Sequence, residues 1–128
     1  MKKEIGLWID HKQAVIVTLF GQEEKIERIS SDIEKYVQAS RSGDDSREDK
    51  RAEQDRGFDD HLSRYYGEVI AYLRDADSIL LFGPGEAKGE LQRQLEEQAL
   101  NERIAGIETT DIMTDAQVMA KVRKYFQG

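Results

Sequence analysis

Three features of the sequence predict an α/β fold. The first thirty residues are rich in β-branched side chains and alternate between apolar and polar, as strands do. From Leu62 onward, apolar residues recur with the period of an α-helix. Between the helical segments lies the apolar run 79–82, which passes through Gly83-Pro84-Gly85 into another helical pattern. A buried strand that turns directly into a helix is typical of α/β proteins.

The composition limits the size and the class of the protein. The 128 residues suffice for one domain with a hydrophobic core, so we expect residues 1–128 to form a single domain. A net charge of −7 opposes non-specific binding to nucleic acid or to an anionic membrane. There is no cysteine, and no apolar run approaches the length of a membrane span. We therefore expect a cytoplasmic protein without a membrane partner.

The N-terminal part predicts an antiparallel meander of three strands. In residues 5–10, Ile5, Leu7 and Ile9 fall on one face and Trp8 on the other. The polar residues 10–13 indicate a tight turn, and the nearly continuous apolar run 14–20 indicates a central strand. The more polar residues 25–30 indicate a third strand near an edge of the sheet.

A charged stretch follows the meander. Residues 38–57 lose all apolar periodicity and carry charges of both signs. Such a segment buries too little apolar surface to offset the entropy of ordering it, so we expect a flexible loop, with a solvated helical extension as the alternative. A loop of this length is often functional. Its basic residues are the candidates for an interaction surface: Arg41, Arg47, Lys50, Arg51 and Arg56.

The remaining chain predicts three helices and two strands. A helix capped at Asp59 or Asp60 carries the strongest periodic pattern, formed by Leu62, Tyr65, Tyr66, Val69, Ile70 and Leu73. A strand over 79–82, a helix from 86 to about 100, a short strand over 104–107 and a last helix follow. The last helix begins with a capping box, Thr114-Asp-Ala-Gln117, and its expected inner face is Val118, Met119, Val122, Tyr125 and Phe126.

The predicted order is therefore βββ-α-β-α-β-α. This is the order of ribonuclease-H-like domains, with a mixed sheet of about five strands. Right-handed crossovers place the helices on both faces of such a sheet.

Asp10 is the one candidate for catalysis. In ribonuclease-H-like nucleases an aspartate on the first strand binds a divalent metal. Such sites need several converging carboxylates, and the fourth strand ends in Phe82-Gly-Pro-Gly85 without one. Glu68 and Glu86 are the remaining partners, but neither spacing is diagnostic. We therefore favour a turn aspartate and expect no metal and no cofactor.

The other polar candidates have ordinary structural explanations. Neither His11 nor His61 stands at a metal-binding spacing, and Tyr65, Tyr66 and Tyr72 fall largely on an apolar stripe, which favours core packing. Gly83, Gly85 and Lys88 form a candidate anion site, because a helix N-terminus offers free backbone N–H groups. The spacing matches no nucleotide-binding motif, and Glu86 competes for the same positive end, so a tight turn is the preferred interpretation.

Several segments together resemble small bacterial "translational machinery" proteins, which are related to the middle domain of the archaeal and eukaryotic peptide-chain release factor and of its ribosome-rescue relative. The resemblance covers most of the chain outside the charged stretch. It rests on residues 6–11, 14–17, 61, 65–66, 68–69, 80–88, 90–91, 107–111, 114–117 and 124–126. It implies a ribonuclease-H-like fold and a place at the ribosome or on tRNA.

In the true release factors a Gly-Gly-Gln motif follows the third strand and positions water against the peptidyl-tRNA ester. The corresponding residues 38–57 contain no such motif, so the resemblance does not carry peptide release over to this chain. The leading hypothesis is a non-catalytic binding module. The alternatives are a metal-dependent nuclease or tRNA-ester hydrolase, and a module that forms a homodimer through the loop or a sheet edge.

Overall fold

The computed structural model describes the backbone of residues 2–31 and 48–128, and the side chains of residues 2–31 and 60–128. Its centre is a mixed sheet in the order β3-β2-β1-β4-β5. The strands are β1 (Lys3–Ile9), β2 (Gln13–Phe20), β3 (Glu23–Ser30), β4 (Ser78–Gly83) and β5 (Ile104–Thr109). The meander of β1, β2 and β3 is antiparallel, whereas β4 and β5 run parallel to β1.

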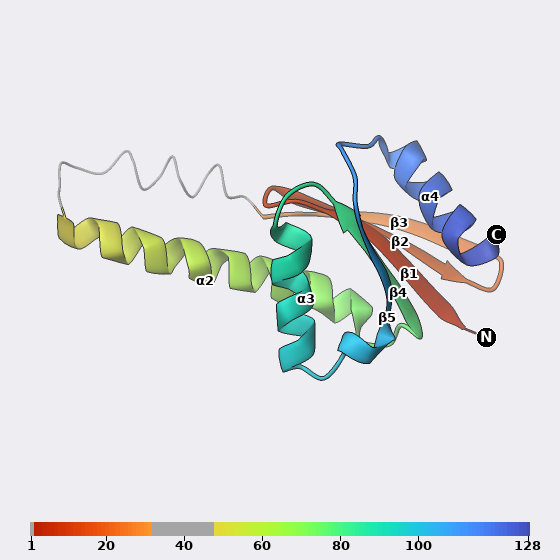
Figure 1. The fold of residues 1–128 in the computed structure, drawn as a ribbon, viewed down its shortest axis with the longest axis horizontal. Coiled ribbons are helices and arrows are strands. Elements are labelled where there is room, and N and C mark those ends of the chain that lie inside the picture. The colour runs from red at the N-terminus through yellow and green to blue at the C-terminus, as the bar shows by residue number, and fades with distance from the viewer. Residues whose placement is uncertain (1, 32–47) are drawn as a thin grey trace.

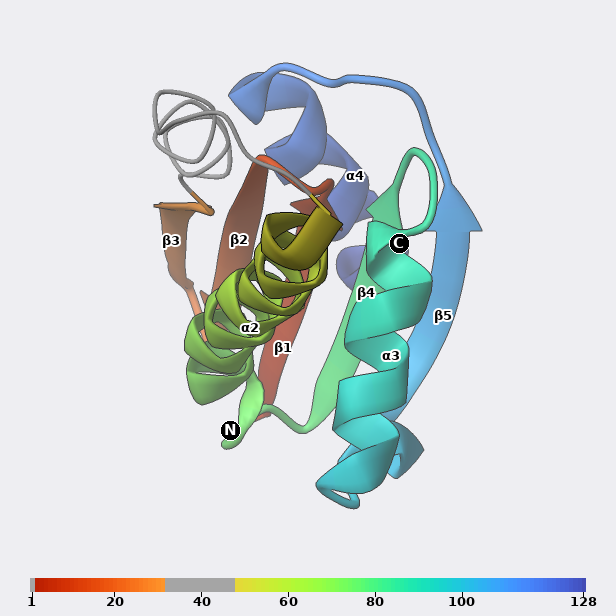
Figure 2. The ribbon, with the colours of Figure 1, turned by 90° about the vertical axis from the view of Figure 1, so that its left-hand side faces the viewer.

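Helices cover both faces of the sheet (Figures 1 and 2). The helices α2 (Glu48–Leu73) and α3 (Ala87–Glu97) lie on one face, and α4 (Asp115–Gln127) lies on the other. A single 3₁₀ turn, η1 (Asn101–Arg103), leads into β5. This architecture confirms the predicted α/β class, the element order and the ribonuclease-H-like arrangement.

The alternation along β1 divides the core into two layers. Ile5, Leu7 and Ile9 are fully buried beneath α2 and α3, whereas Trp8 is buried beneath α4. Each layer is completed by strands on both sides of β1, because β1 pairs with β2 and β4 at once. The strand therefore has no solvent-facing side, which explains why its polar residues, Lys3 and Glu4, are confined to its start.

The helix α2 begins at Glu48, not at Asp59 or Asp60 as the sequence indicated. Residues 48–57 are therefore helical, which corrects the expected flexible loop over that part and agrees with the alternative of a helical extension. With 26 residues, α2 is about 39 Å long, and its N-terminal half projects beyond the sheet (Figure 1). A helix anchored at its C-terminal half can propagate through helix-forming residues such as Ala52, Glu53 and Gln54 without a buried stripe. Residues 38–47 lie outside the described residues.

Three smaller expectations fail at exposed positions. The helix α3 ends at Glu97 instead of about residue 100, because Ala99 adopts a left-handed φ of 59° that closes the helix. Tyr72 is 40% exposed and lies outside the core. Tyr125 is 43% exposed and does not join the inner face of α4; its hydroxyl donates to the Ala105 carbonyl on β5 at 3.0 Å.

The start of α4 matches the predicted capping box. The Thr114 hydroxyl accepts from the Gln117 N–H at 3.1 Å, and the Gln117 side chain accepts from the Thr114 N–H at 2.8 Å. Val118 and Val122 are fully buried on the inner face, and Met119 and Phe126 flank them. The segment before α4 is held by Trp8, whose indole N–H donates to the Asp111 carbonyl at 3.0 Å.

The approach of α4 to β1 requires a glycine at position 6. A Cβ at Gly6 would overlap the side chain of Val122. We expect Gly6→Ala to lower the free energy of unfolding by about 1–3 kcal/mol through overpacking, measured by urea denaturation. Adding Val122→Ala should recover part of the loss, because it removes the overlapping methyl groups.

Gly89 provides the matched control for this substitution. It lies in α3 with no atom near the place of an added Cβ. Gly89→Ala should leave stability unchanged or raise it by about 0.5–1 kcal/mol. Equal effects of the two alanines would contradict the close packing at Gly6.

Candidate functional site

Asp10 closes the turn between β1 and β2. Its carboxylate oxygen Oδ1 accepts from the backbone N–H groups of Lys12 and Gln13, each at 2.8 Å. Its own N–H donates to the Gln13 carbonyl at 3.0 Å. This is the geometry in which aspartate side chains stabilise turns. The sequence candidate for metal binding thus has a structural role here.

The described residues offer no set of ligands for a metal ion. Over residues 2–31 and 60–128, no three His, Asp or Glu side chains gather closely enough to hold one. Glu68 and Glu86, the partners considered for Asp10, are both exposed.

A polar cluster that joins three elements lies beside this turn. The Glu90 carboxylate on α3 accepts from the Tyr66 hydroxyl on α2 at 2.6 Å and from Nε2 of His11 at 2.9 Å. Both bonds end on the same oxygen, Oε1. Because an ionised carboxylate only accepts, Nε2 of His11 carries the proton and Nδ1 of a neutral ring remains an acceptor. We call His11, Tyr66 and Glu90 the polar cluster.

The environment of the cluster keeps its tyrosine neutral. Burial raises the pKa of Tyr66 far above its usual value, and the hydrogen bond to the Glu90 carboxylate raises it further. Burial also raises the pKa of the neighbouring Tyr65, with Asp10 adding a smaller effect. Both phenols therefore act as hydrogen-bond donors rather than as bases at neutral pH.

A second set of bonds ties the end of β3 to the same turn. The Tyr65 hydroxyl donates to the Asp10 carbonyl at 3.0 Å, and the Ser31 hydroxyl donates to the His11 carbonyl at 2.6 Å. Nε2 of His61 bonds the Ser31 carbonyl. His61 thus ties α2 to the end of β3, and His11 ties the β1–β2 turn to α3.

Two shallow cavities lie on either side of Glu90 and Arg93. One, of about 360 Å³, reaches His11, Ser63 and Tyr66. The other, of about 590 Å³, reaches Gly85, Lys88 and Ile107. Their polar rims carry both signs of charge, with Glu90 and Arg93 common to both. The cluster can therefore orient a polar group at an open surface, but it does not form an enclosed pocket.

The candidate anion residues do not converge on one point. Gly83 is buried with a φ of 146°, and a Cβ there would collide with the backbone of Ile9. Gly83 therefore allows β4 to close against β1. Gly85, with a φ of 66°, makes the tight turn into α3, and the Lys88 amine donates back to its carbonyl at 2.7 Å. Close packing against β1 thus explains Gly83, and the turn into α3 explains Gly85.

The structure describes the backbone of only three of the five basic residues predicted to form an interaction surface. Arg41 and Arg47 lie outside the described residues. Lys50, Arg51 and Arg56 fall on the projecting part of α2, for which the backbone alone is described.

In the described part of the chain, no helix is long and apolar enough to cross a membrane.

Sequence reasoning missed the polar cluster. Two signals were present: Tyr66 places a hydroxyl on a buried stripe, where it needs a partner, and Glu90 lies next to Leu91 at the margin of the buried face of α3. Neither signal indicates which residues form the hydrogen bonds, because His11 and Glu90 are 79 residues apart in the sequence.

The five-stranded mixed sheet with helices on both faces places the chain among small α/β domains. No family model and no curated protein matches the sequence. Among solved structures, the chain resembles the Pelota protein of Thermoplasma acidophilum, with 13% identity and a TM-score of 0.63 over 99% of this chain. It also resembles Pelota of Archaeoglobus fulgidus, with 16% identity and a TM-score of 0.58 over 97% of this chain.

The archaeal translation termination factor aRF1 shares the fold as well, with 13% identity and a TM-score of 0.55 over 94% of this chain. In each comparison the chain spans only about a third of the other protein: 32%, 31% and 33%. At these identities the likeness establishes a common fold.

The bond from Tyr66 to Glu90 should contribute measurably to stability. We expect Tyr66→Phe to lower the free energy of unfolding by about 1–2 kcal/mol, because it removes a donor from a partly buried carboxylate. Urea denaturation at neutral pH measures this loss. Tyr72→Phe at a 40% exposed position is the control and should change stability by less than about 0.5 kcal/mol. Equal losses would contradict a specific role of the bond.

The raised pKa values of Tyr65 and Tyr66 predict a loss of stability in alkali. The folded state keeps both phenols protonated, so their stabilising effect is complete below the pKa of about 10 in the unfolded chain and declines above it. We expect the free energy of unfolding to fall as the pH rises beyond that value, and tyrosinate absorbance to rise as the chain unfolds. The double variant Tyr65→Phe, Tyr66→Phe should show a weaker pH dependence, and an unchanged slope would refute this cause.

Proposed function

We propose that this chain is a non-catalytic binding module that associates with the ribosome, or with tRNA on it, during translation or ribosome rescue. The observation that supports the proposal is the shared fold with Pelota and with a translation termination factor, which extends over 94% or more of this chain. The resemblance of the sequence to the release-factor middle domain points the same way. The proposal implies a cytoplasmic protein.

The chain itself gives reasons to exclude peptide release from the proposal. Its 128 residues contain no Gly-Gly-Gln, the motif that positions water in true release factors. The polar groups beside the β1–β2 turn are engaged in joining α2, α3 and the turn. A scaffold of this kind can dock without performing chemistry.

The projecting half of α2 supports a docking role. It extends beyond the sheet where a partner can reach it (Figure 1), and Lys50, Arg51 and Arg56 fall on it. Arg41 and Arg47 precede it in the same charged stretch. Because the net charge is −7, we propose local basic contacts of this arm with RNA phosphates instead of overall electrostatic attraction.

Sedimentation with ribosomes tests this proposal. We expect the tagged protein in ribosomal fractions from growing or starved cells, with binding that weakens as salt increases. The variant Lys50→Glu, Arg51→Glu should reduce co-sedimentation about tenfold or more, because both changes replace attraction to phosphate by repulsion. The control Lys2→Glu, Lys124→Glu makes the same change of charge at exposed positions away from the arm and should bind normally.

Two outcomes would contradict the proposal. Absence from ribosomal fractions in both growth states would remove its basis. Hydrolysis of peptidyl-tRNA by the purified chain would show that the module is an enzyme, and the same assay with RNA and DNA in the presence of magnesium or manganese covers nuclease activity. In each assay an Asp10→Asn variant would identify activity that depends on that carboxylate.

A further inference from the structure

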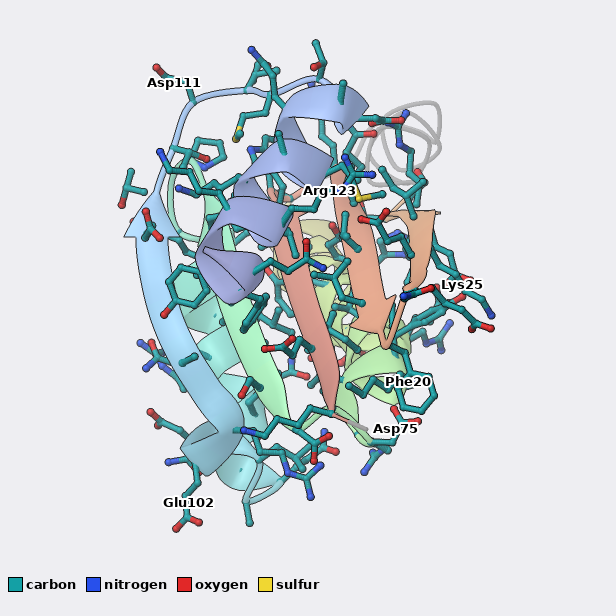
Figure 3. The ribbon with its side chains drawn as sticks, turned by 90° about the vertical axis from the view of Figure 1, so that its right-hand side faces the viewer. Phe20, Lys25, Asp75, Glu102, Asp111 and Arg123 are labelled. Carbon is teal, nitrogen blue, oxygen red and sulfur yellow. The ribbon has the colours of Figure 1, made fainter. Side chains whose placement is uncertain are left out.

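The outer edge of β3 is open in the described part of the chain. The order β3-β2-β1-β4-β5 gives β3 one neighbour, β2, and leaves its other side without a described partner. Figure 3 shows Lys25 at this outer side of the sheet. An open edge presents backbone N–H and C=O groups that can pair with another strand.

The register of the β2–β3 ladder shows which backbone groups face outward. The Ser31 N–H donates to the Lys12 carbonyl at 2.9 Å, so this pair is hydrogen-bonded. Hydrogen-bonded and non-hydrogen-bonded pairs alternate along an antiparallel ladder. Counting back along the register, Lys25 and Glu27 direct their backbone groups to β2, and Glu24, Ile26 and Arg28 direct theirs to the open edge.

The side chains of β3 carry a charge pattern that complements itself. Read from residue 24 to 28, the strand is Glu, Lys, Ile, Glu, Arg. If a second copy lies antiparallel with the two Ile26 residues opposite each other, Lys25 faces Glu27 of that copy and Glu24 faces its Arg28. Each such pair has opposite charge, and the outward backbone groups of Glu24, Ile26 and Arg28 meet in hydrogen-bonded positions.

We propose that β3 pairs with β3 of a second copy of this chain, centred on Ile26, to form a symmetric dimer with one continuous sheet. Charged side chains on an edge strand ordinarily oppose pairing. Here the charges favour one partner in one register, because directly opposite pairs of unlike charge stabilise a ladder and pairs of like charge destabilise it.

The neighbouring symmetric registers are less favourable. If the two-fold axis of the dimer passed through Lys25 instead of Ile26, Lys25 would face Lys25 of the other copy, and Glu23 would face Glu27 of the other copy. If the axis passed through Glu27, Glu27 would face Glu27 of the other copy, and Arg28 would face Ile26 of the other copy. In each case like charges meet at the centre of the interface, so the register centred on Ile26 is selected electrostatically.

Ion pairs between β3 and α4 within one copy extend the alternation of charge on the face of the sheet that α4 covers. Arg123 donates to the Glu24 carboxylate, with one bond at 2.9 Å, and this interaction lowers the pKa of Glu24. Arg28 forms an ion pair with Asp115 at the start of α4. In the dimer, charges would alternate from Arg123 to Glu24, then to Arg28 and Asp115 of the other copy. Ile26, 40% exposed in the single chain, would be covered by its own copy.

Sedimentation velocity as a function of concentration tests the proposal. The interface is a single strand pair, small for a stable dimer, so we expect a reversible dimer whose population grows with concentration. Glu27→Lys and Lys25→Glu should each raise the dissociation constant about tenfold or more, because each converts two symmetric attractive pairs into repulsive ones. The double variant Lys25→Glu, Glu27→Lys restores unlike pairs and should restore the dimer.

Two further variants separate pairing from folding. Ile26→Pro removes an outward N–H that β2 does not use, so it should abolish the dimer and leave the circular dichroism spectrum native. Glu102→Lys, at an exposed position in η1, makes the same change of charge as Glu27→Lys away from the edge and should not affect the dimer.

A chain that stays monomeric into the millimolar range would overturn the proposal. So would a dimer that persists in Ile26→Pro and Glu27→Lys, because its interface would lie elsewhere. A folded double variant that fails to regain the dimer would overturn the register and with it the proposal.

Discussion

The strand β1 is the element on which the rest of the structure depends. It pairs with β2 and β4 at once, and both of its faces are covered by helices. Its alternation assigns Leu7 and Ile9 to the layer of α2 and α3, and Trp8 to the layer of α4. Gly6 permits α4 to approach directly, since a larger residue would meet Val122. A shift of register by one residue would exchange the two layers, so the whole core depends on this pairing.

The carboxyl end of β1 then determines how the helices are joined to the sheet. Asp10 closes the turn by accepting backbone N–H groups, and Tyr65 of α2 donates to its carbonyl. The polar cluster connects the same turn to α3 through Glu90. Because the turn, α2 and α3 share these bonds, they are linked at one end of the domain, from which the N-terminal half of α2 projects.

Much of this fold could be predicted from the sequence, because its signals are local. The alternation in β1, the apolar stripe from Leu62 to Leu73 and the capping box at Thr114 each depend on neighbouring residues alone. The start of α2 at Glu48 could not be predicted, since a helix extended from an anchored segment needs no apolar stripe. The cluster of His11, Tyr66 and Glu90 was missed because its members meet only through the tertiary fold. Gly83 was noted for its turn, but its close approach to Ile9 depends on the pairing of β4 with β1.

The two faces of the sheet are covered unequally, and this has a consequence for local unfolding. On the face covered by α4, the fully buried side chains come from β1, β2, β4 and two valines of α4, whereas the other face is covered by two helices. Detachment of α4 would expose Trp8, Leu80 and Phe82 and leave the layer beneath α2 and α3 intact. Amide hydrogens of α4 should therefore exchange with solvent by subglobal opening, before those of the central strands. Since Arg123 and Asp115 tie α4 to β3, that opening would also release the side chains of the sheet edge.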